Sequence, residues 1–140
     1  MRIEEIQRSC EQELALLTDG AAQCDYLMML GMEMEPVFAV REDRYRIGGC
    51  RTAIWLRIRE EEGRVTFEAD SDSLLVKGIL FLFGSMYQGR TREEIRGCPP
   101  RFIDQISELV IYPEIRHNGL GKCYRRLSGD ISDAPDQKIE

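Results

Sequence analysis

The chain has 140 residues, of which 43% are hydrophobic and 31% charged, and its formal net charge is −6 at pH 7. This length predicts one domain with a single core. The acidic balance argues against a nucleic-acid partner, because nucleic acids bind to concentrated basic surfaces. The charged N-terminus lacks the apolar core of a signal peptide, and the longest apolar run, residues 78–87, is shorter than the roughly 18 residues that suggest a membrane span. We therefore expect a cytoplasmic protein with reduced cysteines that binds no membrane.

Two helices are predicted at the start of the chain. Apolar residues recur at helical spacing over residues 2–17 and again over residues 21–34. Thr18 or Asp19 lies between them and can cap the second helix. The following segment, residues 35–44, contains a proline and a cluster of charges, so we expect an irregular connection there.

The middle of the chain predicts a β-hairpin. Residues 53–70 alternate apolar and polar side chains, and the sequence EEEG at residues 60–63 supplies a polar turn. The alternation places Ile54, Leu56 and Ile58 on one face of the first strand. The segment YRI, residues 45–47, can add a short third strand, which is about the minimum for a sheet that helices cover on one face.

A helix follows the hairpin directly, over residues 74–87. We expect Asp70 or Ser71 to cap it and Asp72 to lie in its first turn, where the helix dipole favours negative charge. This segment is apolar almost all round, which predicts burial, with Gly78 and Gly84 allowing close packing against the sheet.

The C-terminal part predicts shorter helices. Thr91 and Glu94 form a capping-box pattern, residues 101–110 follow a pair of prolines, and a loop at residues 118–119 precedes a last helix. Residues 129–140 are polar and are predicted to be a disordered tail, which leaves one domain over residues 1–128. Helices, then strands, then helices indicate an α+β fold with a small antiparallel sheet flanked by helices.

The five cysteines have no regular spacing. They are Cys10, Cys24, Cys50, Cys98 and Cys123, and the only histidine is His117. No CxxC pair is present, so the spacing of zinc or iron–sulfur sites is absent, and we expect no bound metal. The thiols therefore serve either as small hydrophobic residues or as one working thiol, and Cys10, Cys24 and Cys123 fall in helices where packing is the simpler interpretation.

Cys50 is distinguished by its neighbours in the sequence YRIGGCRTAIWLRI, residues 45–58. Gly48 and Gly49 allow a tight bend and leave the approach to the thiol open, while the strand that follows fixes its other side. Arg51 is adjacent, and a nearby cation favours the nucleophilic thiolate. Spacing alone leaves two interpretations open, a turn entering a strand and a reactive site.

Several motifs in chain order resemble the SufE family of sulfur-acceptor proteins. They are Gly49-Cys50 followed by Thr52 and Trp55, the segment DSDSLLVKG at residues 70–78, the segment YQGRTREEI at residues 87–95, and Arg116 to Leu120. The resemblance runs from about residue 26 to residue 127. The sequence departs from the family pattern at Arg51, where Gln is common, at Thr52, where Ser is usual, and at Ala69, where Gly often stands.

The resemblance implies a SufE/IscU-like fold and a role in sulfur transfer. Cys50 would accept persulfide sulfur from a pyridoxal-phosphate-dependent cysteine desulfurase (SufS-like), stimulate that enzyme and deliver sulfur to an iron–sulfur scaffold (SufB-like). Gly48, Gly49 and Arg51 would support the loop, and Asp72 and Arg116 match positions near the acceptor loop or the desulfurase contact. The protein itself would hold no cofactor.

Two other functions use the same residues. An iron–sulfur assembly scaffold would need about three thiolate or carboxylate ligands converging on one site. A thiol hydrolase would need Cys50 within hydrogen-bond reach of His117, a pairing that only the fold can bring about.

Overall fold

A computed structural model describes residues 2–131. The α-helices are α1 (Ile3–Ala15), α2 (Gly20–Glu33), α3 (Leu74–Tyr87), α4 (Arg92–Arg96) and α5 (Gly121–Ser128). The strands are β1 (Ile54–Glu61), β2 (Arg64–Ser71) and β3 (Arg90–Thr91). Three short 3-10 helices, η1 (Phe38–Val40), η2 (Asp43–Tyr45) and η3 (Arg101–Gln105), and a π-helical segment, η4 (Glu114–Leu120), complete the described part.

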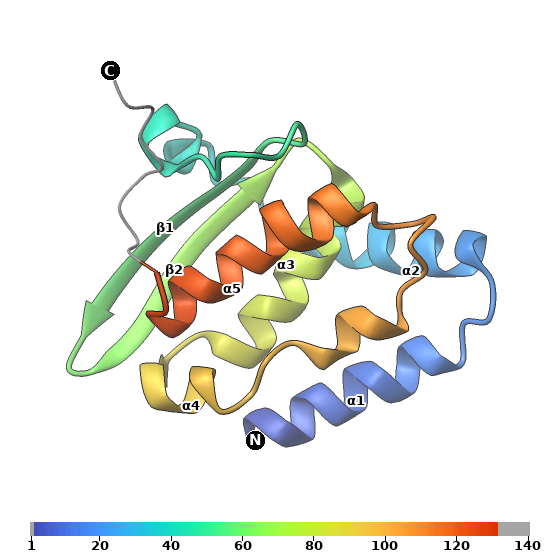
Figure 1. Cartoon of the computed structure of the whole chain (residues 1–140), viewed down its shortest axis with the longest axis horizontal. Coiled ribbons are helices and arrows are strands. Elements are labelled where there is room, and N and C mark those ends of the chain that lie inside the picture. Colours follow the sequence, from blue (N-terminus) through green and yellow to red (C-terminus); the bar gives the residue numbers. More distant parts are fainter. Residues whose placement is uncertain (1, 132–140) are drawn as a thin grey trace.

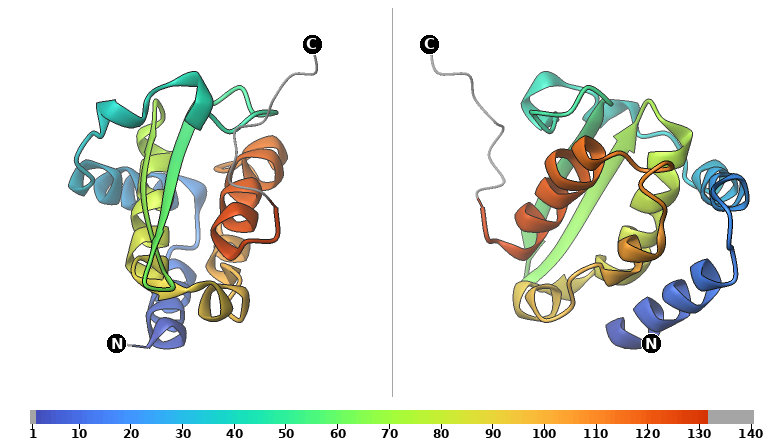
Figure 2. Two further views of the ribbon diagram at one scale, coloured as in Figure 1. Left: turned by 90° about the vertical axis from the view of Figure 1, so that its left-hand side faces the viewer. Right: turned by 45° about the vertical axis from the view of Figure 1, so that its right-hand side comes forward.

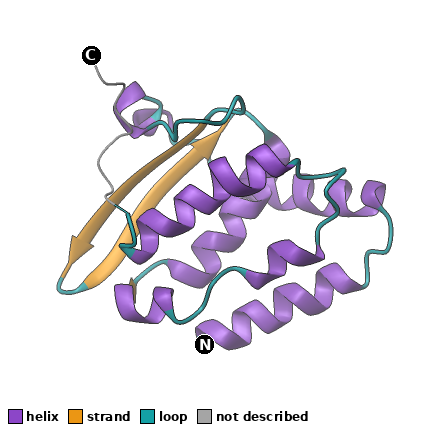
Figure 3. Cartoon of the chain, in the orientation of Figure 1, coloured by secondary structure: helices purple, strands orange, loops and turns teal. Residues whose placement is uncertain are grey.

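The hairpin β1–β2 forms one layer, and α3 and α5 lie side by side on one of its faces (Figures 1 and 2). Helices α1 and α2 pack on the far side of α3, so the core lies between the hairpin and the helices. Figure 3 shows that helices make up most of the chain around the two long strands. The α+β prediction, with a small antiparallel sheet flanked by helices, is confirmed.

The hairpin has the register that its pattern predicts. Ile54 pairs with Ser71 and Leu56 with Ala69, so the apolar residues of both strands face the helices. Glu62 and Gly63 form the turn with φ of 52° and 76°, the left-handed conformation at two successive residues that matches the twist of a tight hairpin.

The third strand is not where the sequence predicted it. Residues 43–45 form η2, and only Arg46 makes a single bridge, to Trp55, before the chain turns at Gly48 and Gly49. The sheet is instead completed by β3, which pairs with β2 at Arg64 and Val65 in the order β1-β2-β3.

Helix α3 has the predicted bounds but not the predicted cap. The ladder between β1 and β2 continues to Ser71, so Asp70 and Ser71 belong to the strand, and Ser73 caps the helix by accepting from the Val76 amide. Asp72 therefore precedes the cap and does not lie in the first helical turn.

The buried Asp70 carboxylate binds the residues on both sides of η1. It accepts hydrogen bonds from the Val37 amide at 3.2 Å and from Arg41 Nε at 2.9 Å, and Lys77 Nζ lies 3.6 Å away. Burial by itself raises the pKa of Asp70, but these hydrogen bonds outweigh it and the pKa lies below its ordinary value.

Gly78 packs against a helix and not against the sheet. A Cβ added at Gly78 would overlap the backbone of Leu27, and one at Gly31 would overlap the carbonyl oxygen of Leu74, so the two glycines let α2 and α3 approach closely. A Cβ at Gly84 would meet nothing within 4 Å, so the predicted packing role is wrong for that residue too.

The C-terminal part differs from the prediction in two places. Residues 101–110 contain only the short η3, whereas the capping box of Thr91 and Glu94 is present at α4 as predicted. The predicted loop at residues 118–119 is helical, because η4 runs directly into α5, and Gly129, with φ of 82°, follows the last residue of α5 as its cap. Most of the predicted tail, residues 132–140, lies outside the described residues. Within residues 2–131, no helix is long and apolar enough to cross a membrane.

Candidate functional site

The candidate site is the Cys50 loop, residues 48–53, which connects η2 with β1 at the end of the hairpin far from its turn (Figure 1). The Ile47 amide donates to the Ile54 carbonyl at 2.8 Å and closes the base of the loop. Gly49 has φ of 84°, a conformation that L side chains rarely adopt, so this position requires the glycine. The loop is therefore short, and the residues on either side of it are held together by a hydrogen bond.

Cys50 is sheltered and not openly exposed. Only 7% of the residue is accessible, and a Cβ placed on Gly119 would lie 3.2 Å from Cys50 Sγ and 2.8 Å from Ile54 Cδ1. The absent side chain at Gly119 is what makes room for the thiol against η4. The prediction of a sterically open thiol is therefore wrong, and Gly119 is a site residue that sequence reasoning missed although it falls within the family motif.

The surroundings of Cys50 disfavour its thiolate. Burial raises the pKa of the thiol, and the carboxylates of Glu114 and Asp72 raise it further. The backbone amide of Thr52 and the Arg46 guanidinium act in the opposite direction but do not outweigh burial. At rest the sulfur is therefore a protonated thiol at neutral pH.

Arg51 does not supply the predicted cation. Its side chain is 94% exposed, and its Nε lies 3.7 Å from Glu114 Oε1. The cation that lowers the pKa of Cys50 is Arg46, four residues earlier. Sequence adjacency misled the prediction because neighbouring side chains in a loop need not share a direction.

Charged side chains hold the backbone of the Cys50 loop from several sides. Glu114 Oε2 accepts from the Arg51 amide at 2.8 Å, and Lys122 Nζ donates to the Gly48 carbonyl at 2.7 Å. Arg46 Nη2 donates to the Arg51 carbonyl at 3.4 Å, and Asp72 Oδ1 accepts from the Ala53 amide at 3.2 Å. Hydrogen bonds to charged groups are stronger than neutral ones, so together these side chains define the resting position of the loop.

The structure brings most of the predicted site residues together. Gly48, Gly49, Arg51 and Asp72 all belong to the Cys50 loop or bond to it. Arg116 does not: its guanidinium donates to the Ile103 and Ile106 carbonyls at 2.9 and 2.8 Å and connects η4 with η3 and the residue that follows it. Its contribution to a partner contact stays a prediction.

A surface hollow of about 410 Å³ borders the loop. It is lined by Arg51, Thr52 and residues 112–115. Tyr112 in this rim is 61% exposed, and Leu109 nearby in the chain is 86% exposed. Tyr112 therefore adds an exposed aromatic side chain to the surface that borders the Cys50 loop.

The other buried thiols belong to the core. Burial raises the pKa of Cys10 and of Cys98 to about 11 and that of Cys123 to about 12. Cys98, whose use the sequence left open, accepts a hydrogen bond from Gln7 Nε2 at 3.3 Å. Cys24, on α2, is half-buried.

His117 does not pair with Cys50. It precedes Gly119, which touches Cys50, by two residues on η4, and residues at that separation point to opposite sides of a helix. The exposed His117 lines a depression of about 240 Å³ with Pro100 and Tyr124. The Cys/His pair of a thiol hydrolase is therefore not formed.

No cluster of three or more His, Cys, Asp or Glu side chains suited to a metal ion occurs within residues 2–131. An assembly scaffold would require such a cluster, so no observation on the described residues favours that alternative.

A family model described as "SufE: Fe-S metabolism associated domain" matches residues 8–131. Among curated proteins, the chain is 31% identical over 125 residues to the chloroplastic/mitochondrial SufE-like protein 1 of Arabidopsis thaliana, covering 84% of this chain and 33% of that protein. It is 27% identical over 113 residues to an uncharacterized SufE-like protein of Synechocystis, covering 79% of this chain and 70% of that protein. The chain thus spans about a third of the length of the Arabidopsis relative.

A solution structure of a hypothetical protein from Thermus thermophilus has the same fold. Its TM-score is 0.65 at 17% identity, covering 89% of this chain and 91% of the other. Because the family model matches residues 8–131, which is nearly all of the described part, the chain belongs to the SufE family, whose domain is described as associated with Fe–S metabolism.

Proposed function

We propose that the protein is a sulfur acceptor and carrier. Cys50 takes persulfide sulfur from a pyridoxal-phosphate-dependent cysteine desulfurase, which the protein thereby stimulates, and passes the sulfur on for iron–sulfur cluster assembly. The observation that carries this proposal is the Cys50 loop itself. Of the five thiols, Cys50 is the one that stands on a loop between a left-handed glycine and a rigid strand.

The transfer is a thiol exchange with no net oxidation. The Cys50 thiol loses its proton, and the thiolate attacks the outer sulfur of the donor persulfide. The sulfur–sulfur bond of the donor breaks, the donor thiolate leaves and takes up a proton, and Cys50 carries the persulfide. Delivery to the next acceptor repeats the same exchange with Cys50 as the donor.

The resting geometry suits a carrier better than a free nucleophile. A buried thiol with a raised pKa reacts slowly with solutes, and a persulfide in the same place would be shielded from reductants. Reaction with the donor then requires the loop to move the sulfur away from Gly119 and toward the partner.

The test is the turnover of a SufS-like cysteine desulfurase, measured as alanine released, with and without this protein. We expect stimulation by the wild type, loss of stimulation in Cys50→Ser, and a mass increase of one sulfur atom on the Cys50 peptide. Cys24→Ser, which changes another accessible thiol, is the matched control and should stimulate as the wild type does. Stimulation that survives Cys50→Ser would refute the proposal.

A further inference from the structure

We infer that Glu114 is a positioning residue that keeps Cys50 in its sheltered place, and that release of its bond to the Arg51 amide lets the thiol move out. This inference deepens the proposed function and rests on it for the use of the exposed thiol. The contact itself is a feature of the folded chain.

Glu114 reaches the residue next to the thiol. Its Oε2 accepts from the Arg51 amide at 2.8 Å while its Oε1 lies 3.7 Å from Arg51 Nε, so one carboxylate engages both the backbone and the side chain of Arg51. The carboxylate is 36% exposed. A cationic group from solvent or from a partner can therefore bind the Glu114 carboxylate without unfolding of the domain.

The same helical segment provides the shelter and the tether. Gly119 forms the surface against which the sulfur packs, and Glu114, five residues earlier on η4, holds the adjacent peptide. Lys122 and Asp72 bond at the edges of the loop, at Gly48 and Ala53. Arg46, which precedes the loop, donates to the Cys50 and Arg51 carbonyls at 3.5 and 3.4 Å, so it contacts the centre of the loop from outside η4. Loss of the Glu114 bond therefore removes the hydrogen bond between the centre of the Cys50 loop and η4 and leaves the longer Arg46 contacts and the bonds at the edges in place.

Glu114 also acts on the thiol through its charge, because it raises the pKa of Cys50. Removing the carboxylate increases the thiolate fraction even if the loop does not move. Two substitutions separate the effects: Glu114→Gln removes the charge but keeps an oxygen that can accept from the Arg51 amide, and Glu114→Ala removes both.

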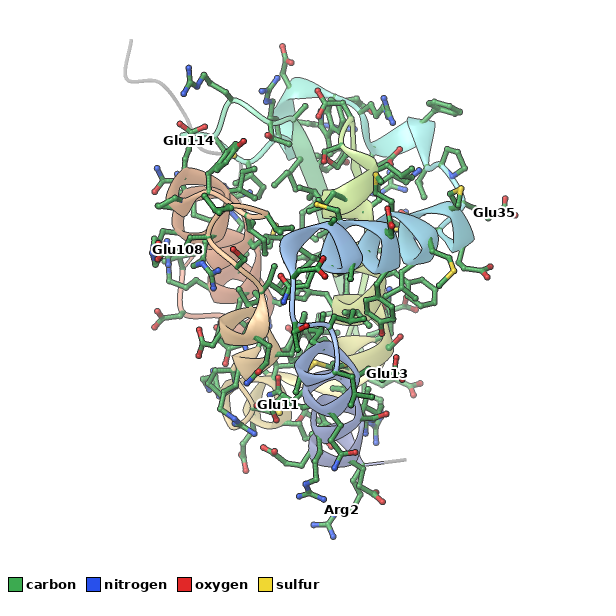
Figure 4. All side chains as sticks on the ribbon, turned by 90° about the vertical axis from the view of Figure 1, so that its right-hand side faces the viewer. Arg2, Glu11, Glu13, Glu35, Glu108 and Glu114 are labelled. Carbon is green, nitrogen blue, oxygen red and sulfur yellow. The ribbon has the colours of Figure 1, made fainter. Side chains whose placement is uncertain are left out.

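The experiment measures the rate of Cys50 alkylation by iodoacetamide in the full chain, by mass spectrometry of the Cys50 peptide. We expect Glu114→Ala to raise the rate about fivefold, since a hydrogen bond to a charged, partly exposed group is lost, and Glu114→Gln to raise it less. Glu108→Ala removes another exposed carboxylate from the same region of the chain (Figure 4) and should leave the rate unchanged. The peptide of the fully buried Cys123 is the internal control for unfolding.

Equal rates in Glu114→Ala and Glu114→Gln would show that only the charge matters and would overturn the inference, as would an unchanged rate in Glu114→Ala. The assay contains no desulfurase, so its result is independent of the proposed function. Faster alkylation of Glu114→Ala together with no desulfurase stimulation by the wild type would leave the tether standing and refute sulfur transfer, and the reverse pattern would refute the tether alone.

Discussion

Gly119→Ala tests whether the missing side chain at this position creates the shelter for Cys50. The added Cβ would lie 2.8 Å from Ile54 Cδ1 and 3.2 Å from Cys50 Sγ. Both distances are below ordinary van der Waals contact, so both neighbours must shift. Ile54 is fully buried at the start of β1 and can shift only at a cost, whereas Cys50 belongs to a loop and can withdraw more easily.

The expected magnitude combines two opposing effects. Replacing a helical glycine with alanine contributes about 1 kcal/mol of helix propensity, whereas overpacking a filled site costs about 1–3 kcal/mol. We place the cost at Gly119 in the middle of this range, because the buried Ile54 side chain must shift within the core whereas Cys50 can withdraw with its loop. We therefore expect Gly119→Ala to lower the free energy of unfolding by about 1 kcal/mol.

Urea unfolding measures this difference, and Gly84→Ala is the matched control. Gly84 is also helical, but a Cβ there meets nothing within 4 Å, so this variant should be stabilised by about 0.5–1 kcal/mol. Gly119→Ala should also alkylate faster at Cys50 than the wild type. If Gly119→Ala were stabilised as much as Gly84→Ala, with no change in alkylation, the close packing of Cys50 on η4 would be refuted.

Three further predictions concern buried polar groups and pH. The alkylation rate of Cys50 should rise with pH through a midpoint above that of a free cysteine peptide, because burial raises the pKa of the thiol; a midpoint at or below the peptide value would contradict this. Asp70→Asn should lower the free energy of unfolding by about 3 kcal/mol in urea titrations, because it removes the buried carboxylate and leaves two partly buried cationic side chains, Arg41 and Lys77, uncompensated. Because the pKa of Asp70 is lowered in the folded state, its contribution is present above the unfolded pKa and is lost as pH falls through the folded pKa, so wild type and Asp70→Asn should converge in acid. Tyr87→Phe removes a buried hydroxyl that donates to the Cys98 carbonyl at 2.7 Å. This substitution should lower the free energy of unfolding by about 1–2 kcal/mol in the same urea titration. An unchanged urea midpoint would contradict the prediction and would mean that the carbonyl finds another donor.

Local patterns predicted the regular elements well. Helix α3 has its predicted bounds because an almost continuous apolar run lies between a capping serine and the end of the run at Tyr87. The hairpin was predicted because strict alternation surrounds the glycine of a two-residue turn at Gly63. The strand β3 was missed because two residues carry no periodicity, and its pairing with Arg64 and Val65 is a matter of tertiary position.

The site was predicted only in part, because some of its residues are adjacent to Cys50 in the sequence and others reach it only through the fold. Gly49 and Cys50 are adjacent, so the sequence alone showed that a tight bend is allowed directly before the thiol, and Gly49 has φ of 84°. The shelter depends on Gly119 and the tether on Glu114, both more than sixty residues away. No spacing rule relates them to Cys50, and Arg51, which proximity favoured as the activating cation, turns toward Glu114.

The arrangement of these contacts limits how the loop can move. Its base is fixed by the Ile47 to Ile54 hydrogen bond and the isolated Arg46–Trp55 bridge, which attach the residues before the loop to β1. The hydrogen bonds to the centre of the loop are made by charged side chains to backbone groups. Its end at Ala53 is held more firmly, because the Ser71 hydroxyl and the Asp72 amide both donate to the Ala53 carbonyl. A change in the hydrogen bonds to the centre therefore moves the thiol relative to Gly119 without disturbing the hairpin. Under the proposed function, a partner that competes for Glu114 would increase both the access to Cys50 and its thiolate fraction, because the carboxylate that tethers the loop also raises the pKa of the thiol.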